Sequence, residues 1–194
     1  GKGGRDMGSH LMHLVIANEM LPALSEIDEV AFLLGSLAPD ATTDKESSHY
    51  YAGRHDDLSR RLDLSQYWID SKEEDFSFRL GYYAHLVADE IWLQGFYKSW
   101  LKEVITRDPS KQAAYYADFD AYNARLSRRL GEFDFERLKG DPAFDELIEK
   151  VERDAAMKEE GTYTMFLPHQ FDGYVDTCVR RCLEMVKRKQ AILI

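Results

Sequence analysis

The segment from Arg79 to Gln94 contains the residues best suited to chemistry. Within it, His85 and Asp89 are four residues apart, so on a helix their side chains leave the same face. Apolar residues flank both of them, which predicts a central, buried helix. A divalent metal would satisfy a buried imidazole and a buried carboxylate together. A neutral His85 hydrogen-bonded to Asp89 or to a backbone carbonyl would also do so, and this pair alone leaves both interpretations open.

Three further positions supply donors of the same kind. His13 opens an apolar stretch, Asp40 follows an Ala-Pro pair, and His49 precedes two tyrosines. With His85 and Asp89 they form an ordered set of five nitrogen and oxygen ligands. Such a set could hold one metal with an open coordination position, or a closely spaced pair of metals.

This ordered set resembles the zinc-dependent phospholipase C family, relatives of bacterial phospholipase C and P1-type nucleases. The resemblance rests on four segments: MHLVIANEM (12–20), FLLGSLAPD (32–40), SHYY (48–51) and GYYAHLVADEIW (81–92). It implies an all-α bundle with zinc ions that activate water against a phosphodiester. It also implies metal ligation by His13, Asp40, His49, His85 and Asp89. Of these, Asp40, His85 and Asp89 are the candidate catalytic residues, and Asp40 could bridge two ions or orient the attacking water.

The chain departs from the family pattern after this segment. The full pattern continues with another histidine and a second HxxxE pair that complete a three-metal site. Here Gly95 stands six residues past Asp89, Gln94 lies beside it, and no later HxxxE exists. We therefore expect one or two zinc ions, or another divalent transition metal. The only downstream histidine is His169, which heads an expected helix and could fold back on the site.

Two other functions compete with a phosphoester hydrolase of this kind. The adjacent pair His55 and Asp56 suggests a phosphohydrolase of the HD type, in which such a pair shares a metal with a further His and Asp. Alternatively, the chain is a non-catalytic helical protein that keeps a metal, or only a polar cluster, to hold its helices in register. Lys45, Arg54 and Arg79 are either phosphate contacts or solvated surface cations.

Composition limits the partners of the chain. Its 194 residues include 25 Lys and Arg against 35 Asp and Glu, a formal net charge of -10. An acidic protein is a poor match for a nucleic-acid groove, so we expect a small phosphoester or phospholipid substrate. No apolar run is long enough to span a bilayer. Cys178 and Cys182 are expected as thiols of the core in a reducing cytoplasm. No oligomeric state is predicted.

The elements expected around these residues are all helical. Residues 1–11 have the composition of an expression leader, so His10 is left out of the expected site, and residues 12–194 form one all-α domain of about six or seven helices. Asp57 to Ile69 is expected as a helix with Leu58 facing the core, and the aromatic residues from Tyr82 to Trp100 are expected mainly as core. The expected helices span residues 13–20, 25–35, 57–69, 75–105, 110–130, 142–160 and 168–189.

Overall fold

The structure is a computed structural model, and it describes residues 9–192. Its helices are α1 (His10–Met20), α2 (Glu29–Leu37), α3 (Lys45–Ser48), α4 (Leu64–Asp70), α5 (Phe76–Trp92), α6 (Lys102–Arg107), α7 (Lys111–Leu130), α8 (Pro142–Ala155) and α9 (Pro168–Ile192). Strands β1 (Tyr51–Ala52) and β2 (Arg61–Leu62) form a small antiparallel pair. Short 3-10 turns cover Leu21–Ala23, Ala38–Asp40 and Phe135–Leu138. The expected all-α fold is confirmed.

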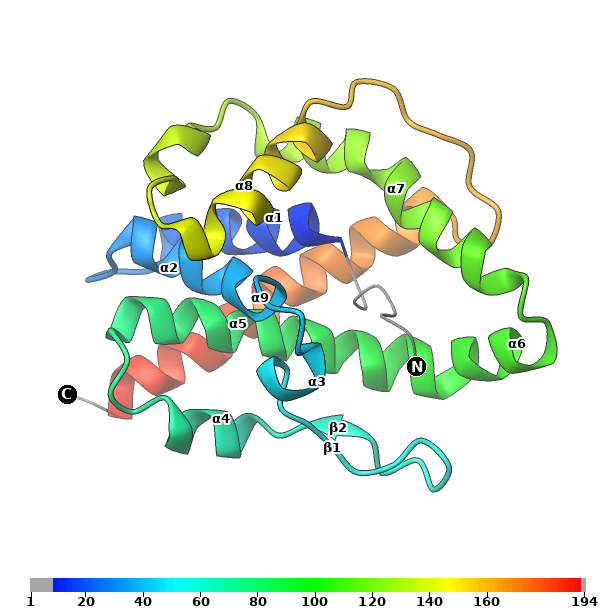
Figure 1. The fold of residues 1–194 in the computed structure, drawn as a ribbon, viewed down its shortest axis with the longest axis horizontal. Helices are drawn as coiled ribbons and strands as arrows, with labels where there is room; N and C mark the ends of the chain where they lie inside the picture. The colour runs from blue at the N-terminus through cyan, green and yellow to red at the C-terminus, as the bar shows by residue number, and fades with distance from the viewer. Residues whose placement is uncertain (1–8, 193–194) are drawn as a thin grey trace.

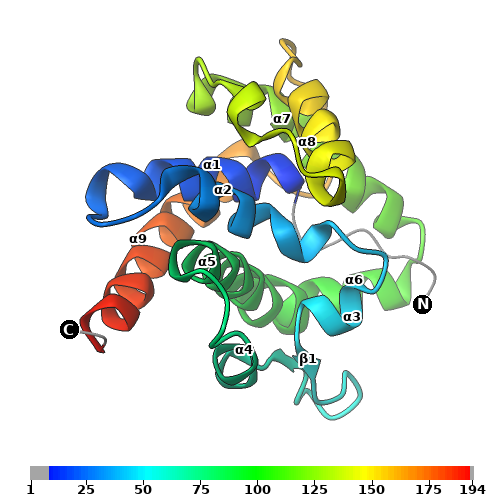
Figure 2. The same ribbon diagram turned by 60° about the vertical axis from the view of Figure 1, so that its left-hand side comes forward.

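Helix α5 lies at the centre of the molecule. Its main packing partner is α2, and α9, α4 and α1 also contact it. Figure 2 shows α5 nearly end-on, with α1 and α2 above it, α9 on one side and α4 below. Helices α7 and α8 pack against each other and cover α1 from the far side (Figure 1). This arrangement brings segments from the first half of the chain around one buried helix.

Two glycines let α2 and α5 approach each other closely. A Cβ atom at Gly35 would lie 2.1 Å from the carbonyl oxygen of Phe78, and one at Gly81 would lie 2.0 Å from that of Phe32. Real side chains do not tolerate such distances, so the backbones touch where both side chains are hydrogen atoms. The contact fixes the end of α2, and with it Asp40, against the turn of α5 that carries His85.

The expected central helix of residues 75–105 is divided in the structure. It begins with Asp75 as N-cap, whose side chain accepts a hydrogen bond from the amide of Phe78. Regular α-helix ends at Trp92, the segment Leu93–Leu101 is π-helical, and α6 follows. Trp92 is fully buried, as expected, whereas Trp100 is 37% exposed.

The prediction of a helix from Asp57 to Ile69 is wrong in its first half. Residues 53–60 form the loop between β1 and β2, and the helix starts only at Leu64, with Asp63 as its N-cap. Leu58 has a positive φ of 62° and is 59% exposed, so it does not face the core. The second expected helix also starts later, because Asp28 rather than Ser25 caps α2.

Cys178 and Cys182 are free, buried thiols on α9, as expected. Among residues 9–192, no helix has the length and apolar character needed to cross a bilayer.

Candidate metal centre

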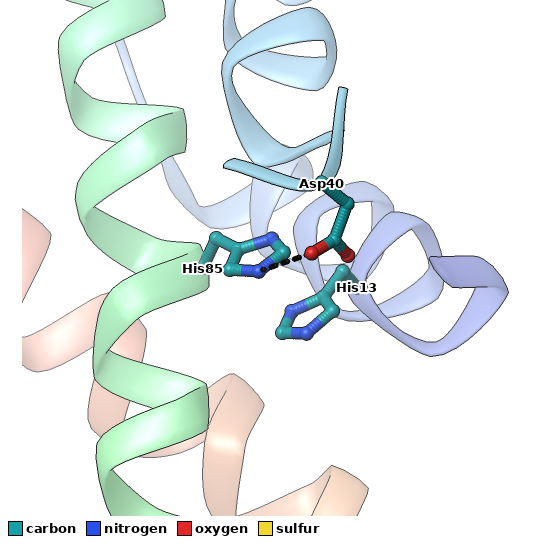
Figure 3. Close-up of side chains that lie close together, drawn as sticks. All are labelled: His13, Asp40 and His85. Atoms are coloured by element: carbon teal, nitrogen blue, oxygen red, sulfur yellow. Dashed lines mark ion pairs between the residues drawn. The ribbon is translucent and has the colours of Figure 1, made fainter. Parts of the chain in front are cut away.

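Four separate segments deliver five buried polar side chains to one place beside α5. His13 comes from α1, Asp40 ends the 3-10 turn that continues α2, His49 follows the last residue of α3, and His85 and Asp89 lie on successive turns of α5. The side chains of Asp40, His49, His85 and Asp89 are 0% exposed, and that of His13 is 2% exposed. In Figure 3, His85, Asp40 and His13 converge from three segments, with a dashed line joining His85 to Asp40. The five residues singled out in the sequence therefore lie together.

The distances among four of these side chains match the dimensions of a zinc site. Nε2 of His49 lies 3.3 Å from Nε2 of His85, and both atoms lie 3.2 Å from Oδ2 of Asp89. Oδ1 of Asp40 lies 3.2 Å from Nε2 of His49 and 3.7 Å from Nε2 of His85. Around a tetrahedral ion with bonds of about 2.0–2.1 Å, ligand atoms are separated by about 3.3–3.4 Å. The arrangement has the size of one coordination sphere.

The outer nitrogens of two imidazoles are held by backbone carbonyls. Nδ1 of His85 donates to the carbonyl oxygen of Ser36 at 2.6 Å, and Nδ1 of His49 donates to that of Lys45 at 3.0 Å. A carbonyl can only accept, so both Nδ1 atoms carry a proton, and in the neutral rings each Nε2 directs a lone pair toward the cluster. This is the orientation that carbonyl or carboxylate partners impose on metal-binding histidines.

His13 and Asp89 contain buried atoms that hydrogen bonds leave unsatisfied. Nε2 of His13 lies 3.0 Å from Oδ1 of Asp89, but the contact lacks hydrogen-bond alignment. Within the described residues, neither carboxylate oxygen of Asp89 and neither ring nitrogen of His13 has a hydrogen-bond partner. Unsatisfied buried polar groups are costly, and a cation bound between these residues would remove that cost. The residues present therefore fit a metal ion.

The pKa values of the cluster follow its two buried carboxylates. Burial opposes a charge on His49, but the carboxylates of Asp40 and Asp89, each with an oxygen 3.2 Å from its Nε2, raise the pKa of His49 to about 10. Burial likewise opposes the charge of Asp89, yet the neighbouring His13 and His85 hold the pKa of that carboxyl well below its ordinary value. For His13, burial and the adjacent His85 lower the pKa, and the two rings stack with centroids 3.5 Å apart. Without a metal, protons on the imidazoles balance the carboxylates.

Two further residues lie at the edge of the centre: His10, which was left out of the expected site, and Lys45, which was expected as a phosphate contact or a solvated surface cation. Nδ1 of His10 lies 2.8 Å from Oδ2 of Asp40, and Nζ of Lys45 lies 3.7 Å from Oδ1 of the same carboxylate. His10 falls in the stretch with leader-like composition, most of which, residues 1–8, lies outside the described residues. Helix α1 nevertheless begins at His10, after its N-cap Ser9. The clearest signal for His10 was its position, three residues before His13 on the same helical face.

Other residues considered from the sequence lie elsewhere. His55 and Asp56 are in the loop between β1 and β2, where Asp56 pairs with Arg54, and neither belongs to a group of described residues that could hold a metal. Arg79 is buried against the ring of Trp68, with its guanidinium carbon 3.5 Å from the ring centroid. His169 is exposed at the start of α9 and lines a groove with Phe96 and Tyr174 instead of the metal centre.

Comparison with known protein families supports the resemblance seen in the sequence. Residues 12–103 match the family model for zinc dependent phospholipase C, and this range contains all five side chains of the centre. The resemblance is therefore confirmed over this part of the chain. The matched family is zinc-dependent, and the buried groups His13, Asp40, His85 and His49, His85, Asp89 can each hold a metal ion, so zinc is the cofactor. Comparisons with curated proteins and with solved structures gave no match.

Proposed function

We propose, on the premise that residues 12–103 belong to the zinc-dependent phospholipase C family, that this chain is a zinc-dependent hydrolase of phosphoester bonds. Its first zinc ion would lie between Nε2 of His49, Nε2 of His85 and carboxylate oxygens of Asp40 and Asp89. His13 would complete the ligand set beside Asp89. His13, Asp40 and His85 form a second, overlapping group. Since the single lone pair of His85 binds only one ion, a second ion would be held by His13 and a carboxylate oxygen of Asp40.

The observation that carries this proposal is the spacing of the four donor atoms. Their separations of 3.2 to 3.7 Å suit one ion, and backbone carbonyls of α2 and α3 hold the Nδ1 atoms of the two imidazoles. A cluster that served only to hold helices together would be expected to satisfy its buried atoms by hydrogen bonds. The unsatisfied atoms of His13 and Asp89 instead favour a cation.

Zinc bound here would supply a Lewis acid for the phosphoryl oxygens and would acidify a water molecule to a pKa of about 7. The remaining steps belong to the protein. Asp40 directs Oδ1 toward His49 and His85, while its Oδ2 faces the edge of the centre, where His10 is partly exposed. Oδ2 accepts a hydrogen bond from Nδ1 of His10 at 2.8 Å, which fixes the carboxylate, and Asp40 would orient the attacking water from this fixed position. Through Ser36 and Lys45, the backbone holds the two imidazoles in place.

The substrate proposed is a phospholipid or another small phosphoester. The matched family is one of phospholipases. In a chain with a net charge of -10, the bound metal would be the main source of positive potential for a phosphate group. A long nucleic acid would meet this acidic surface unfavourably.

A non-catalytic metal-binding protein is the second candidate, and one observation favours it. The four central side chains are fully buried, and catalytic zinc sites keep an open position for water and substrate. On this alternative, zinc would bind and no phosphoester would be hydrolysed. Activity measurements on zinc-loaded protein separate the two candidates.

The test combines elemental analysis with a screen of phosphodiester and phosphomonoester substrates. Protein purified without a metal-affinity column should contain one or two zinc ions per chain and should hydrolyse a phosphoester. His85→Ala and Asp89→Asn should lose both zinc and at least about a hundredfold of activity, because loss of even an outer partner of a metal ligand costs about 10- to 100-fold.

Two matched variants serve as controls for this test. His169→Ala removes an exposed histidine, and Asp118→Asn changes a fully buried carboxylate that accepts hydrogen bonds from the amides of residues 164–166. Both should keep zinc and activity, although Asp118→Asn should lower stability. Protein without stoichiometric zinc, iron, manganese or nickel would rule out the hydrolase. Turnover that persists in His85→Ala would indicate a contaminating enzyme.

A further inference from the structure

Lys45 occupies a distinct position at the metal centre. Its Nζ atom lies 3.7 Å from Oδ1 of Asp40, yet its side chain is 32% exposed while that of Asp40 is 0% exposed. The lysine therefore reaches from solvent to the rim of a buried cluster. A ligand that approaches the cluster past this rim would meet the ammonium group.

The position of Lys45 is coupled to the centre through the backbone. Lys45 is the first residue of α3, and the side chain of the preceding Asp44 accepts a hydrogen bond from the amide of Ser47. The carbonyl oxygen of Lys45 accepts the Nδ1 proton of His49 at 3.0 Å. The segment that orients one imidazole thus also carries the cation.

Formal charges show what this cation adds to a loaded centre. The carboxylates of Asp40 and Asp89 cancel the two charges of one zinc ion, and neutral imidazoles contribute none. Such a centre has no net charge to attract a phosphate group. With Lys45 included, the net charge becomes positive by one unit, which complements a phosphodiester monoanion.

Neighbouring cations are engaged elsewhere. Arg60 pairs with Glu46, the residue next to Lys45, at 2.5 Å, and Arg54 pairs with Asp56. Arg79 contacts the side chain of Ser71 and the ring of Trp68. Among the lysines and arginines of residues 9–192, Lys45 is the one that forms an ion pair with a side chain of the centre, Asp40.

We infer that Lys45 is a specificity-determining residue that binds a phosphoryl oxygen of the substrate beside the zinc centre. This inference rests on the proposed hydrolase function and deepens it. A zinc ion held by Asp40 would weaken the attraction of that carboxylate for the ammonium group of Lys45, which stays at the rim within reach of a phosphoryl oxygen. An ester without a charged phosphoryl group gains nothing from this contact, so Lys45 selects anionic substrates.

The primary test measures binding of inorganic phosphate to zinc-loaded protein by calorimetry. Lys45→Met should weaken phosphate binding by about tenfold or more, which is the scale of one partly exposed charged hydrogen bond. Lys45→Arg should retain binding within about threefold, because guanidinium also binds phosphate. Lys158→Met removes the same charge from an exposed position and should bind phosphate like the unchanged protein. Zinc content should be equal in all four proteins.

A second measurement compares a soluble aryl phosphodiester with a short-chain phospholipid. Lys45→Met should raise KM more than it lowers kcat, and the substrate for which KM rises identifies the natural source of the phosphoryl group. Unchanged phosphate binding in Lys45→Met, an equal loss in Lys158→Met, or loss of zinc from Lys45→Met would overturn the inference. If phosphate binding depends on Lys45 while no phosphoester is hydrolysed, the inference holds and the hydrolase proposal fails.

Discussion

The imidazole of His49 is placed where a proton and a metal ion compete. Its Nδ1 is held by the carbonyl of Lys45, and its Nε2 lies 3.2 Å from carboxylate oxygens of both Asp40 and Asp89. In the metal-free chain these carboxylates raise the pKa of His49 to about 10 against the penalty of burial. A zinc ion at the same position must displace that proton.

Zinc affinity should therefore rise with pH. At pH values below the raised value of about 10, binding releases a proton from His49, so affinity should increase about tenfold per pH unit. The folding stability of the metal-free chain should change with pH in the opposite direction. A raised pKa stabilises the fold below about pH 6.5, and that stability is lost as pH rises toward about 10. Competition with a chromogenic chelator at pH 6, 7 and 8 measures the first effect. A flat affinity profile would show that no proton is displaced.

At the scale of elements, the contact between α2 and α5 sets the geometry of the centre. Ser36 and Asp40 follow Gly35 on one side of the contact, and His85 follows Gly81 by one turn on the other. The sequence showed Gly81 one turn before His85, but its role requires a view of the partner helix, because the close approach to the carbonyl of Phe32 is a tertiary contact.

Gly81→Ala should separate the two helices. The added Cβ atom would lie 2.0 Å from the carbonyl oxygen of Phe32, and overpacking of this kind costs about 1–3 kcal/mol of unfolding free energy. Zinc affinity should fall as well, because Asp40 moves away from His85. Gly173→Ala is the matched control: nothing lies within 4 Å of its added Cβ atom on α9, so about 1 kcal/mol of helix propensity should make it neutral or stabilising. Urea unfolding gives both free energies. Equal stability of the two variants would contradict the close contact.

Periodicity in the sequence predicted the helices that bury one apolar face, and so α1, α5, α7, α8 and α9 were expected near their observed positions. It failed between Asp57 and Ile69, where Leu58 continues the apolar spacing but adopts a positive φ in an exposed loop. Spacing cannot distinguish a core position from a loop position when neighbouring elements decide the outcome. It also gave no warning that the central helix becomes π-helical after Trp92.

For the molecule as a whole, the metal centre connects four separate segments from the first half of the chain. Loops and short helices separate the segments that carry His13, Asp40, His49 and His85 along the sequence. Their order in the sequence identified them as a set, because imidazoles and carboxylates within apolar stretches need partners. The contribution of His10 could not be found in this way, since its surrounding composition resembles a leader and its contact with Asp40 depends on where α1 begins.

Removing zinc should therefore destabilise the entire helical fold and not the site alone. Ligand at about 1,000 times its dissociation constant stabilises a protein by about 4 kcal/mol, and 1 kcal/mol shifts Tm by about 2–4 °C in a chain of this size. We expect a chelator to lower Tm by about 8–16 °C in calorimetry. Added zinc should restore it, whereas magnesium should not, because imidazole donors disfavour that ion. His85→Ala should melt at the same temperature with and without the chelator. If its Tm fell as far as that of the unchanged protein, the chelator would be acting on some other part of the chain.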